Sequence, residues 1–409
     1  MAKEDIIVGL DIGTTKVCTV IGEIDEDRVE IIGVGTSPSH GLRKGVVVNI
    51  DSTIKSIENA VSEAELMAGI EVSSVFAGIA GGHIKGMNSH GVIAISRGRE
   101  VTQSDVERVI DAAKAVSIPL DREVIHVLPQ QFIIDGQDGI KEPVGMSGVR
   151  LEVEIHIVTG AVTSAQNIIK CVNRAGFEVE DIVLEPLAAA YAVLTEDEKD
   201  LGVVLVDIGG GTTDIAIFID GSIWHTGVLS IGGDNVTKDI SVGLRTPIVE
   251  AEKIKINYGS CMSSLVKDEE IITIPSVGEH KERNLPRQVL AEIIEPRMEE
   301  IFSLINQEIR MTGYENLVTS GIVLTGGASM LEGTTELAER VFDLPVRIGT
   351  PTGVSGLVDV VNSPLYSTGV GLVTYGMMHK LEGKKAKFGG GNVFRRVLNR
   401  MKEWVGEFF

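Results

Sequence analysis

The chain has 409 residues, 43% of them hydrophobic and 23% charged, and its formal net charge is −21. This balance predicts a globular protein of two or more domains, and the strong negative charge argues against nucleic acid as the main partner, since nucleic-acid binding needs a basic surface. Three widely spaced cysteines, no basic signal sequence and no apolar run of ~20 residues favour a cytoplasmic protein without disulfides, zinc or a membrane-spanning helix.

The chain opens with two apolar runs joined by a glycine turn. The runs Ile6 to Leu10 and Val17 to Ile21 predict strands, and Asp11-Ile-Gly-Thr-Thr-Lys16 predicts a tight turn between them. Glycine lets the backbone approach a phosphate, and threonine adds short polar contacts. The turn therefore suits an anion, and Asp11 at the end of its strand is placed to hold a hydrated Mg²⁺.

The next segments predict a layered α/β domain with an insertion. A helix is expected at Ser52 to Ala68, between strand-like runs. Residues 83–158 break this rhythm and predict a small inserted module with one helix, Ser104 to Ala115. Regular alternation then resumes with a helix at Ser164 to Ala175, a strand at Val179 to Leu184 and a helix at Pro186 to Leu194.

Glu185 stands between that strand and the helix that follows. A carboxylate at the C-terminal end of a strand lies where α/β sheets place their ligands. We therefore predict that Glu185 positions a hydrolytic water, with helix capping as the alternative. The acidic stretch Thr195 to Asp200 is interpreted as a hinge.

A second glycine turn repeats the first one. Asp207-Ile-Gly-Gly-Gly-Thr-Thr-Asp214 also joins two apolar runs, Val203 to Val206 and Ile215 to Ile219. One such turn is weak evidence because hairpins use Asp and Gly for backbone reasons alone. Two copies at domain-scale spacing predict a nucleotide between two related half-molecules, with Asp207 as a second Mg²⁺ contact.

Three later features suit the rest of a nucleotide, although each has a simpler alternative. Gly232-Gly-Asp-Asn235 opens a helix whose free N–H groups suit a phosphate or ribose, or it is a plain helix cap. Glu252 and Lys255 share one helix face and bracket a ribose or base, or they form a surface ion pair. Thr325-Gly-Gly-Ala-Ser329 offers bare backbone to a base, or it is only a turn. Between them, Pro296 predicts a kink or two abutting helices within the helical run Pro286 to Met311.

Five of these segments, in chain order, resemble the nucleotide-site motifs of the actin, Hsp70 and sugar-kinase superfamily. They are the first glycine turn, Glu185-Pro-Leu-Ala-Ala-Ala190, the second glycine turn, Gly232-Gly-Asp-Asn235 and Thr325-Gly-Gly-Ala328. Within this superfamily, the chain is similar to the FtsA family of bacterial cell-division proteins, also in Ser39-His-Gly-Leu-Arg-Lys-Gly, Ile322-Val-Leu-Thr-Gly-Gly, Tyr366-Ser-Thr-Gly-Val-Gly-Leu and the basic tail. The resemblance implies an α/β, actin-like fold: two lobes of duplicated α/β domains around ATP or ADP with Mg²⁺, an inserted α+β subdomain and a C-terminal amphipathic helix. It also implies weak or no ATPase activity.

The resemblance also assigns roles to individual residues. Phosphate contacts would come from Gly13, Thr14, Thr15 and Lys16 on one side and from Gly209, Gly210, Gly211, Thr212 and Thr213 on the other. Adenosine would contact Gly232, Gly233, Glu252, Lys255, Gly326, Gly327 and Ala328. Asp11 and Asp207 would hold Mg²⁺ through water.

The expected domain boundaries follow from the same comparison. The first lobe comprises residues 1–82 and 159–199, with the inserted subdomain at 83–158. The second lobe comprises residues 200–228 and 301–365, with a further subdomain at 229–300. A helix at 366–383 returns to the first lobe, and a flexible linker at 384–391 leads to an amphipathic helix at 392–409.

That last segment predicts a membrane-surface helix. On a helical projection its apolar side chains fall within one arc of about 160°, flanked by basic side chains at the level of lipid headgroups. This pattern favours binding to anionic lipid over packing on the protein's own domain. The residues predicted to meet the membrane are Val393, Phe394, Arg395, Val397, Leu398, Arg400, Met401, Lys402, Trp404, Val405, Phe408 and Phe409.

The combined prediction is an ATP-binding, actin-like cell-division protein that polymerises at the cytoplasmic face of the cell membrane, at the division site. The resemblance implies as partners the protein itself, the tubulin-like division protein FtsZ, meeting roughly residues 229–300, and other divisome membrane proteins. Three alternatives stay open: an actin-like scaffold for pilus or other envelope machinery, a small-molecule kinase, and a chaperone ATPase, which is disfavoured because too little chain follows Gly327 for a substrate domain.

Overall fold

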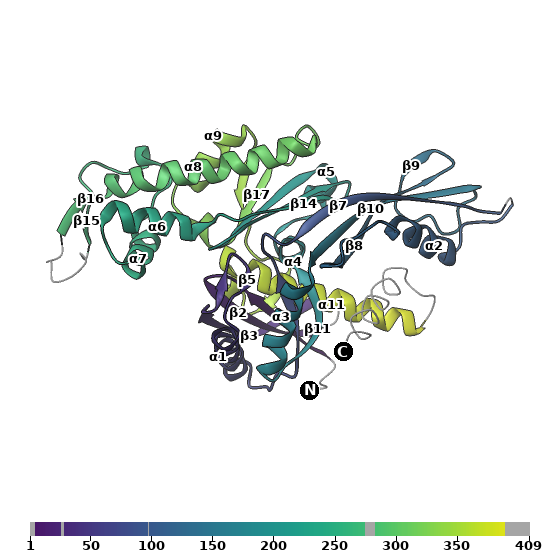
Figure 1. Cartoon of the computed structure of the whole chain (residues 1–409), viewed down its shortest axis with the longest axis horizontal. Helices are drawn as coiled ribbons and strands as arrows, with labels where there is room; N and C mark the ends of the chain where they lie inside the picture. The colour runs from purple at the N-terminus through teal and green to yellow at the C-terminus, as the bar shows by residue number, and fades with distance from the viewer. Residues whose placement is uncertain (1–4, 26–27, 97, 275–282, 389–409) are drawn as a thin grey trace.

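The structure, a computed structural model, describes residues 5–25, 28–96, 98–274 and 283–388. Two lobes, each built on one sheet, lie beside each other, and a third sheet forms an inserted subdomain at one end of the molecule (Figure 1). No helix in these ranges is both long enough and apolar enough to cross a bilayer. The predicted membrane helix at 392–409 lies outside the described residues.

The first lobe is built on a six-stranded sheet. In spatial order its strands are β11 (Glu178–Leu184), β6 (Ser74–Ile79), β1 (Ile6–Ile12), β2 (Lys16–Asp25), β3 (Arg28–Pro38) and β19 (Val354–Gly356). Strands β1 to β3 form an antiparallel meander, while β6, β11 and β19 join in parallel. Helices α1 (Ile50–Ala68), α3 (Val162–Arg174), α4 (Glu185–Val193) and α11 (Ser367–Phe388) pack around this sheet.

The second lobe repeats this topology in five strands. Their order is β14 (Ser222–Leu229), β13 (Thr213–Ile219), β12 (Val203–Ile208), β17 (Ile322–Thr325) and β18 (Val346–Ile348). Strands β12 to β14 form the meander, and β17 and β18 add in parallel. The duplicated α/β architecture predicted from the two turns is therefore confirmed.

The helices of the second lobe surround a separate core. They are α5 (Glu196–Leu201), α6 (Gly233–Leu244), α7 (Ile248–Tyr258), α8 (Arg287–Thr312) and α9 (Thr334–Phe342), with a hairpin of β15 (Ile271–Ile274) and β16 (Arg283–Pro286). Helix α8 is a single helix through Pro296, so the prediction of two abutting helices is wrong. Met298, Ile301 and Phe302 are fully buried beside the proline, and this packing holds the helix together.

The inserted subdomain has its own sheet and core. Its strands lie in the order β7 (Lys85–Ala94), β10 (Arg150–Ala161), β8 (Arg122–Ile134) and β9 (Gln137–Ile140), and α2 (Gln103–Lys114) packs on β7 and β10. Although the subdomain leaves the first lobe, it is hydrogen-bonded to β14 of the second. His156 lies between the side-chain oxygens of Asn88, at 2.6 Å, and Thr226, at 2.9 Å.

Several expected boundaries fall elsewhere. Strand β19 and the short helix α10 (Val358–Val361) contact β3, so the chain returns to the first lobe before residue 366. The three residues of β19 carry too little pattern to reveal its pairing with a strand so far away in the sequence.

Three other expected boundaries also differ. Residue 300 lies inside α8, and the predicted hinge at 195–200 is largely the short helix α5. Helix α11 continues to Phe388, through the first part of the expected linker. Lys and Ala at 384–387 are good helix formers, which explains that extension.

Candidate functional site

The two glycine turns meet between the lobes. The Thr15 hydroxyl donates a hydrogen bond to Oδ1 of Asp234, at 3.3 Å. A Cβ atom added to Gly210 would lie 1.8 Å from Oγ1 of Thr15, and one added to Gly211 would lie 2.7 Å from Oγ1 of Thr14. Only residues without a side chain allow this approach, which explains the run of glycines in the second turn.

The start of α6 packs on the second turn. The backbone N–H of Gly233 donates to the carbonyl of Gly209 at 2.9 Å, and that of Asp234 donates to the carbonyl of Gly210 at 2.8 Å. A Cβ atom at Gly232 would lie 2.6 Å from the Gly209 carbonyl oxygen. The expectation of free N–H groups at Gly233 and Asp234 is therefore wrong, because these groups fasten α6 to the turn.

Four carboxyl groups lie behind the two turns, with Asp11 and Asp214 buried and Asp207 and Glu185 half-buried. Asp11 is the next-to-last residue of β1, Glu185 begins α4, and Asp207 lies directly opposite Asp214 in the β12–β13 pairing. Burial raises the pKa of Asp11 and of Asp207 to about 6, and burial with the charge of Asp207 raises the pKa of Asp214 to about 8. Burial, and then the charges of Asp11, Asp214 and Asp207, raise the pKa of Glu185 well above its usual value.

This cluster fits a hydrated divalent cation. Oδ1 of Asp214 is buried and has no hydrogen-bond partner among the described residues, which is costly unless another group satisfies it. Within the described ranges no three His, Cys, Asp or Glu side chains are arranged to bind one ion directly. Mg²⁺ usually keeps several of its waters, so Asp11, Asp207 and Asp214 are suited to hold it through water.

The third turn lies against the carboxylates. Gly326 has φ +83°, and a Cβ atom there would lie 2.2 Å from Oδ1 of Asp207. The pairing of Asp207 with Thr325 in the parallel strands β12 and β17 produces this contact. The next residue, Gly327, lies beside Leu365 instead.

The predicted adenosine residues come together only in part. A Cβ atom at Gly233 would lie 3.3 Å from Cβ of Ala328 and 3.4 Å from Nζ of Lys255. The buried Lys255 ammonium donates to the Gly233 carbonyl at 3.2 Å and pairs with Glu252 at 2.7 Å. Lys255 and Glu252 thus form an ion pair, as the simpler of the two sequence-based interpretations expects. The pair is partly buried and does not lie on the surface.

Lys16 contacts the segment before α11, and its charge also lowers the pKa of Asp11 and of Asp207. Its ammonium donates to the carbonyl of Leu365 and lies 4.8 Å from the centre of the Tyr366 ring. The structure thus directs Lys16 to the segment before α11. Thr212 and Thr213 complete the second turn, where the Thr213 hydroxyl donates to the Ile231 carbonyl at 2.9 Å.

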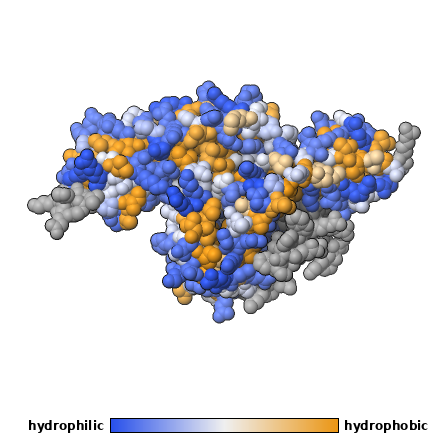
Figure 2. All heavy atoms as spheres, in the orientation of Figure 1, coloured by the Kyte–Doolittle hydropathy of each residue, from blue (hydrophilic) through white to orange (hydrophobic). Residues whose placement is uncertain are grey.

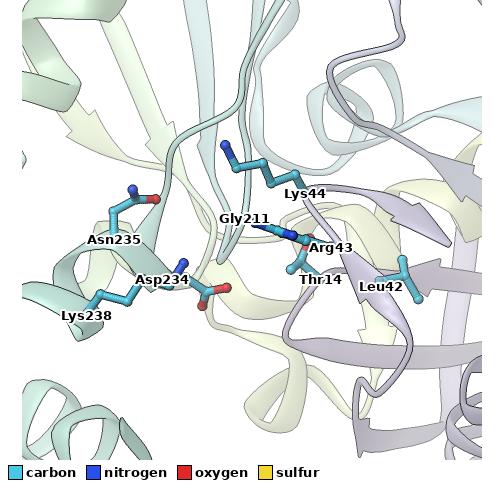
Figure 3. A pocket seen from close by; sticks show the side chains of 8 residues that line it. All are labelled: Thr14, Leu42, Arg43, Lys44, Gly211, Asp234, Asn235 and Lys238. Carbon is cyan, nitrogen blue, oxygen red and sulfur yellow. The ribbon is translucent and has the colours of Figure 1, made fainter. Parts of the chain in front are cut away.

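Sequence reasoning missed several residues of this region. Asp214 stood at the end of the second motif, and its spacing from Asp207 across a hairpin could have revealed it. Thr368 donates to Oδ2 of Asp207 at 3.2 Å, but nothing in the local pattern predicts this contact. A pocket of about 150 Å³ beside the turns is lined by Arg43, Lys44 and Lys238 among others (Figure 3).

Comparisons with protein families agree with this architecture. The model described as "Cell division protein FtsA" matches residues 204–371, and the model of the SHS2 domain inserted in FtsA matches residues 81–159. The Hsp70 model matches residues 163–243.

Similar proteins cover nearly the whole chain. A cell division protein FtsA from Pseudomonas aeruginosa is 55% identical over 98% of this chain and 97% of the relative, and that from Escherichia coli K12 is 44% identical over 98% and 96%. Among solved structures, a PilM–PilN type IV pilus biogenesis complex matches with a TM-score of 0.67 at 15% identity, over 91% of this chain and 98% of the other.

Spiroplasma citri MreB5 bound to ADP matches with a TM-score of 0.58 at 16% identity, over 93% and 98% of the two chains. The likenesses to solved structures show the fold alone, and the sequence relatives show the family. The chain has the actin-like ATPase fold, and it belongs to the FtsA family of cell division proteins.

Proposed function

We propose that this protein binds ATP with Mg²⁺ between its lobes and polymerises at the cytoplasmic face of the cell membrane, where it anchors FtsZ and recruits other divisome membrane proteins. The contact between the two glycine turns, with four buried or half-buried carboxyl groups behind it, supports the nucleotide part of the proposal. Backbone N–H groups in such turns suit phosphates, and the carboxylates suit the accompanying cation.

The proposed ligand is an adenine nucleotide, since Spiroplasma citri MreB5, which shares the fold, has been solved with ADP and with AMPPNP bound. In this scheme Gly13, Thr14 and Thr15 contact phosphates from one lobe, and residues 209–213 contact them from the other. A ligand held by both lobes favours the arrangement in which they are closed. The nucleotide then acts mainly as a conformational clamp.

Glu185 is poorly suited to act as a base in this site. Burial, and then the charges of Asp11, Asp214 and Asp207, raise its pKa well above the ordinary value, which disfavours the ionised form that a base needs. In the absence of a bound cation this supports slow or absent turnover. A bound cation would lower the pKa of Glu185 and move the site toward hydrolysis.

Membrane attachment rests on the sequence of residues 392–409. An amphipathic helix with basic flanks binds anionic lipid reversibly, at roughly 1 kcal/mol for each cation near the surface. Polymerisation would present many such helices together, so assembly and membrane binding would strengthen each other through effective concentration. MamK, a protein with a similar fold, has been solved as a double helical filament.

The subdomain around 229–300 offers a surface for FtsZ. Val242 on α6, Val249 and Ile256 on α7, and Ile271 on β15 are each more than 60% exposed. Figure 2 shows apolar residues among the polar surface at this end of the molecule. Exposed apolar side chains gathered on neighbouring elements are typical of a protein-binding surface.

Nucleotide binding is tested by calorimetry with ATP, with and without Mg²⁺. We expect binding that Mg²⁺ strengthens, and we expect Asp207→Asn to weaken the Mg²⁺-dependent part by about tenfold, since a charged contact is lost. Asp138→Asn on the exposed strand β9 is the matched control. Absence of any heat with an adenine nucleotide would remove the nucleotide part of the proposal.

Membrane and partner binding are tested separately. Deletion of residues 392–409 should release the protein from anionic liposomes in co-sedimentation, while Glu403→Gln, on the polar face, should leave it bound. Pull-down with the full chain should recover FtsZ. Recovery of pilus or other envelope proteins in place of FtsZ would favour the scaffold alternative.

A further inference from the structure

A small hairpin covers the meeting point of the two turns. Strands β4 (Leu42–Arg43) and β5 (Val46–Val47) form it, and Lys44 and Gly45 make its tip. The N–H of Gly45 donates to Oγ1 of Thr14 at 2.9 Å, so the tip is fastened to the first turn. The hairpin therefore moves with the phosphate-facing residues of the first lobe.

The tip is held in an unusual backbone conformation. Lys44 has φ 52°, a left-handed conformation that non-glycine residues seldom adopt. Gly45 has φ +74°, and a Cβ atom there would lie 2.8 Å from Cα of Gly81. Backbone strain of this kind persists where surrounding contacts impose it, and it concentrates at binding sites.

The pocket beneath the tip is positively charged in a negatively charged protein. Its lining includes Arg43 and Lys44 from the hairpin and Lys238 from α6 of the other lobe, against one acidic side chain, Asp234. Figure 3 shows Arg43 extending from the hairpin toward Gly211, with Lys44 beside it and with Asp234 and Lys238 on the α6 side. None of the three cations forms an ion pair with a residue in the described ranges.

The size of the pocket points to the kind of group it takes. Sites for whole small molecules have volumes of about 300–1,000 Å³. This pocket, at about 150 Å³, suits a single phosphate group and not a nucleoside. Thr14 and Gly211 also line it, so it adjoins the place proposed for the phosphates of the nucleotide.

We infer that Arg43, Lys44 and Lys238 bind the terminal phosphate of a nucleoside triphosphate and so distinguish it from a diphosphate. This inference rests on the proposed nucleotide site. Arg43 and Lys44 come from the first lobe and Lys238 from the second, so one phosphate in the pocket draws both lobes toward it. A diphosphate, whose last phosphate stops short of the pocket, lacks this link.

The test compares ATP with ADP in calorimetry on the full chain. The double variant Arg43→Gln/Lys44→Gln and the single variant Lys238→Gln remove charge from exposed side chains and keep their length. We expect the double variant to lose about tenfold or more in ATP affinity, as for loss of a charge-assisted contact, and to change ADP affinity by no more than about twofold. Lys55→Gln, an exposed cation on α1, is the matched control.

Salt gives a second readout. Because the three cations are exposed, the preference of the wild-type protein for ATP over ADP should shrink as ionic strength rises, and that of the double variant should change little. An equal loss of ATP and ADP affinity, or no loss, would overturn the inference while leaving the nucleotide site intact. If the wild-type protein binds neither nucleotide, the proposed function fails first. Thermal unfolding of each variant shows that it is folded.

Discussion

Asp207 and Asp214 lie opposite each other in the β12–β13 pairing, with Asp214 buried and Asp207 half-buried. Burial is the main cause that raises both pKa values from 3.8, to about 6 for Asp207, where the charge of Asp11 adds to it, and to about 8 for Asp214, where the charge of Asp207 adds to it. The folded protein then holds protons more tightly than the unfolded chain does. Its stability is therefore greatest below about pH 4, as far as these groups decide, and falls as pH rises toward 8.

Asp214→Asn should remove the loss of stability that Asp214 causes at high pH. Each unit by which the pKa is raised lowers the free energy of unfolding by roughly 1.4 kcal/mol at a pH above the folded-state pKa. The variant should therefore be more stable than the wild type at pH 8 in a chelating buffer. The difference should shrink toward zero near pH 4. Urea unfolding at pH 4, 6 and 8 measures it.

The exposed residue Asp138 provides the control for this series, since Asp138→Asn should give the same small difference at every pH. Added Mg²⁺ should stabilise the wild type more than Asp214→Asn at pH 8. A stability difference between wild type and Asp214→Asn that did not change with pH would show that the pKa of Asp214 is not raised in the folded protein.

Gly326 gives a prediction about close approach. Its φ of +83° favours glycine, and a Cβ atom would lie 2.2 Å from Oδ1 of Asp207 and 2.6 Å from the Ile208 carbonyl. Gly326→Ala should lower the free energy of unfolding by about 3 kcal/mol or more, through strain together with the clash. Gly353 has φ +75° and no atom within 4 Å of such a Cβ, so Gly353→Ala should cost only about 1 kcal/mol. Equal losses in urea unfolding would mean that the contact with Asp207 is unimportant.

At the scale of elements, the interface between the inserted subdomain and β14 connects the two lobes. His156, which is 1% exposed, joins Asn88 of β7 to Thr226 of β14, and Gln130 of β8 donates to the Ile223 carbonyl at 3.1 Å. The subdomain grows out of the first lobe between β6 and α3. Any rotation between the lobes must therefore carry this interface with it or break it.

His156→Ala should weaken that interface. It leaves the buried hydroxyl of Thr226 without its partner and opens a cavity, which should cost about 2 kcal/mol. Hydrogen exchange should increase in β14 and β7 more than in β1 and β2. His90→Ala, which removes a histidine with a 46% exposed side chain from the same subdomain, should change stability by less than about 0.5 kcal/mol. Uniform exchange throughout the chain would contradict a local role for His156.

The elements differ in how far the sequence reveals them. Ile6 to Leu10 and Val203 to Val206 are continuous apolar runs that end in Asp and Gly, so both hairpins, and the duplication, were predictable. The pairing of Val354–Gly356 with β3 was not, since it depends on a partner more than 300 residues away. The contact between Gly45 and Thr14, and the burial of Lys255, also arise from tertiary packing that no local pattern records.

At the scale of the whole molecule, the two lobes share part of one core. Leu205 and Ala216 of the second sheet belong to the same buried cluster as Ala188 and Ala189 of α4 and the strands of the first lobe. Helix α4 therefore lies between the sheets, with Glu185 at its start.

The contact between the turns makes nucleotide entry testable by cross-linking. A Cβ atom at Gly211 would lie 3.0 Å from Cβ of Thr14, close to the roughly 3.5–4.5 Å that a disulfide requires. Thr14→Cys/Gly211→Cys should form a disulfide under mild oxidation, and the three native cysteines are buried and should not interfere. Because phosphates between the turns would separate them, ATP with Mg²⁺ should slow this reaction several-fold, and each single variant should give no cross-link. A disulfide that forms equally fast with and without saturating nucleotide would mean that the ligand binds elsewhere. If the cross-linked protein binds no nucleotide and regains binding after the disulfide is reduced, the closed turns had blocked the nucleotide site.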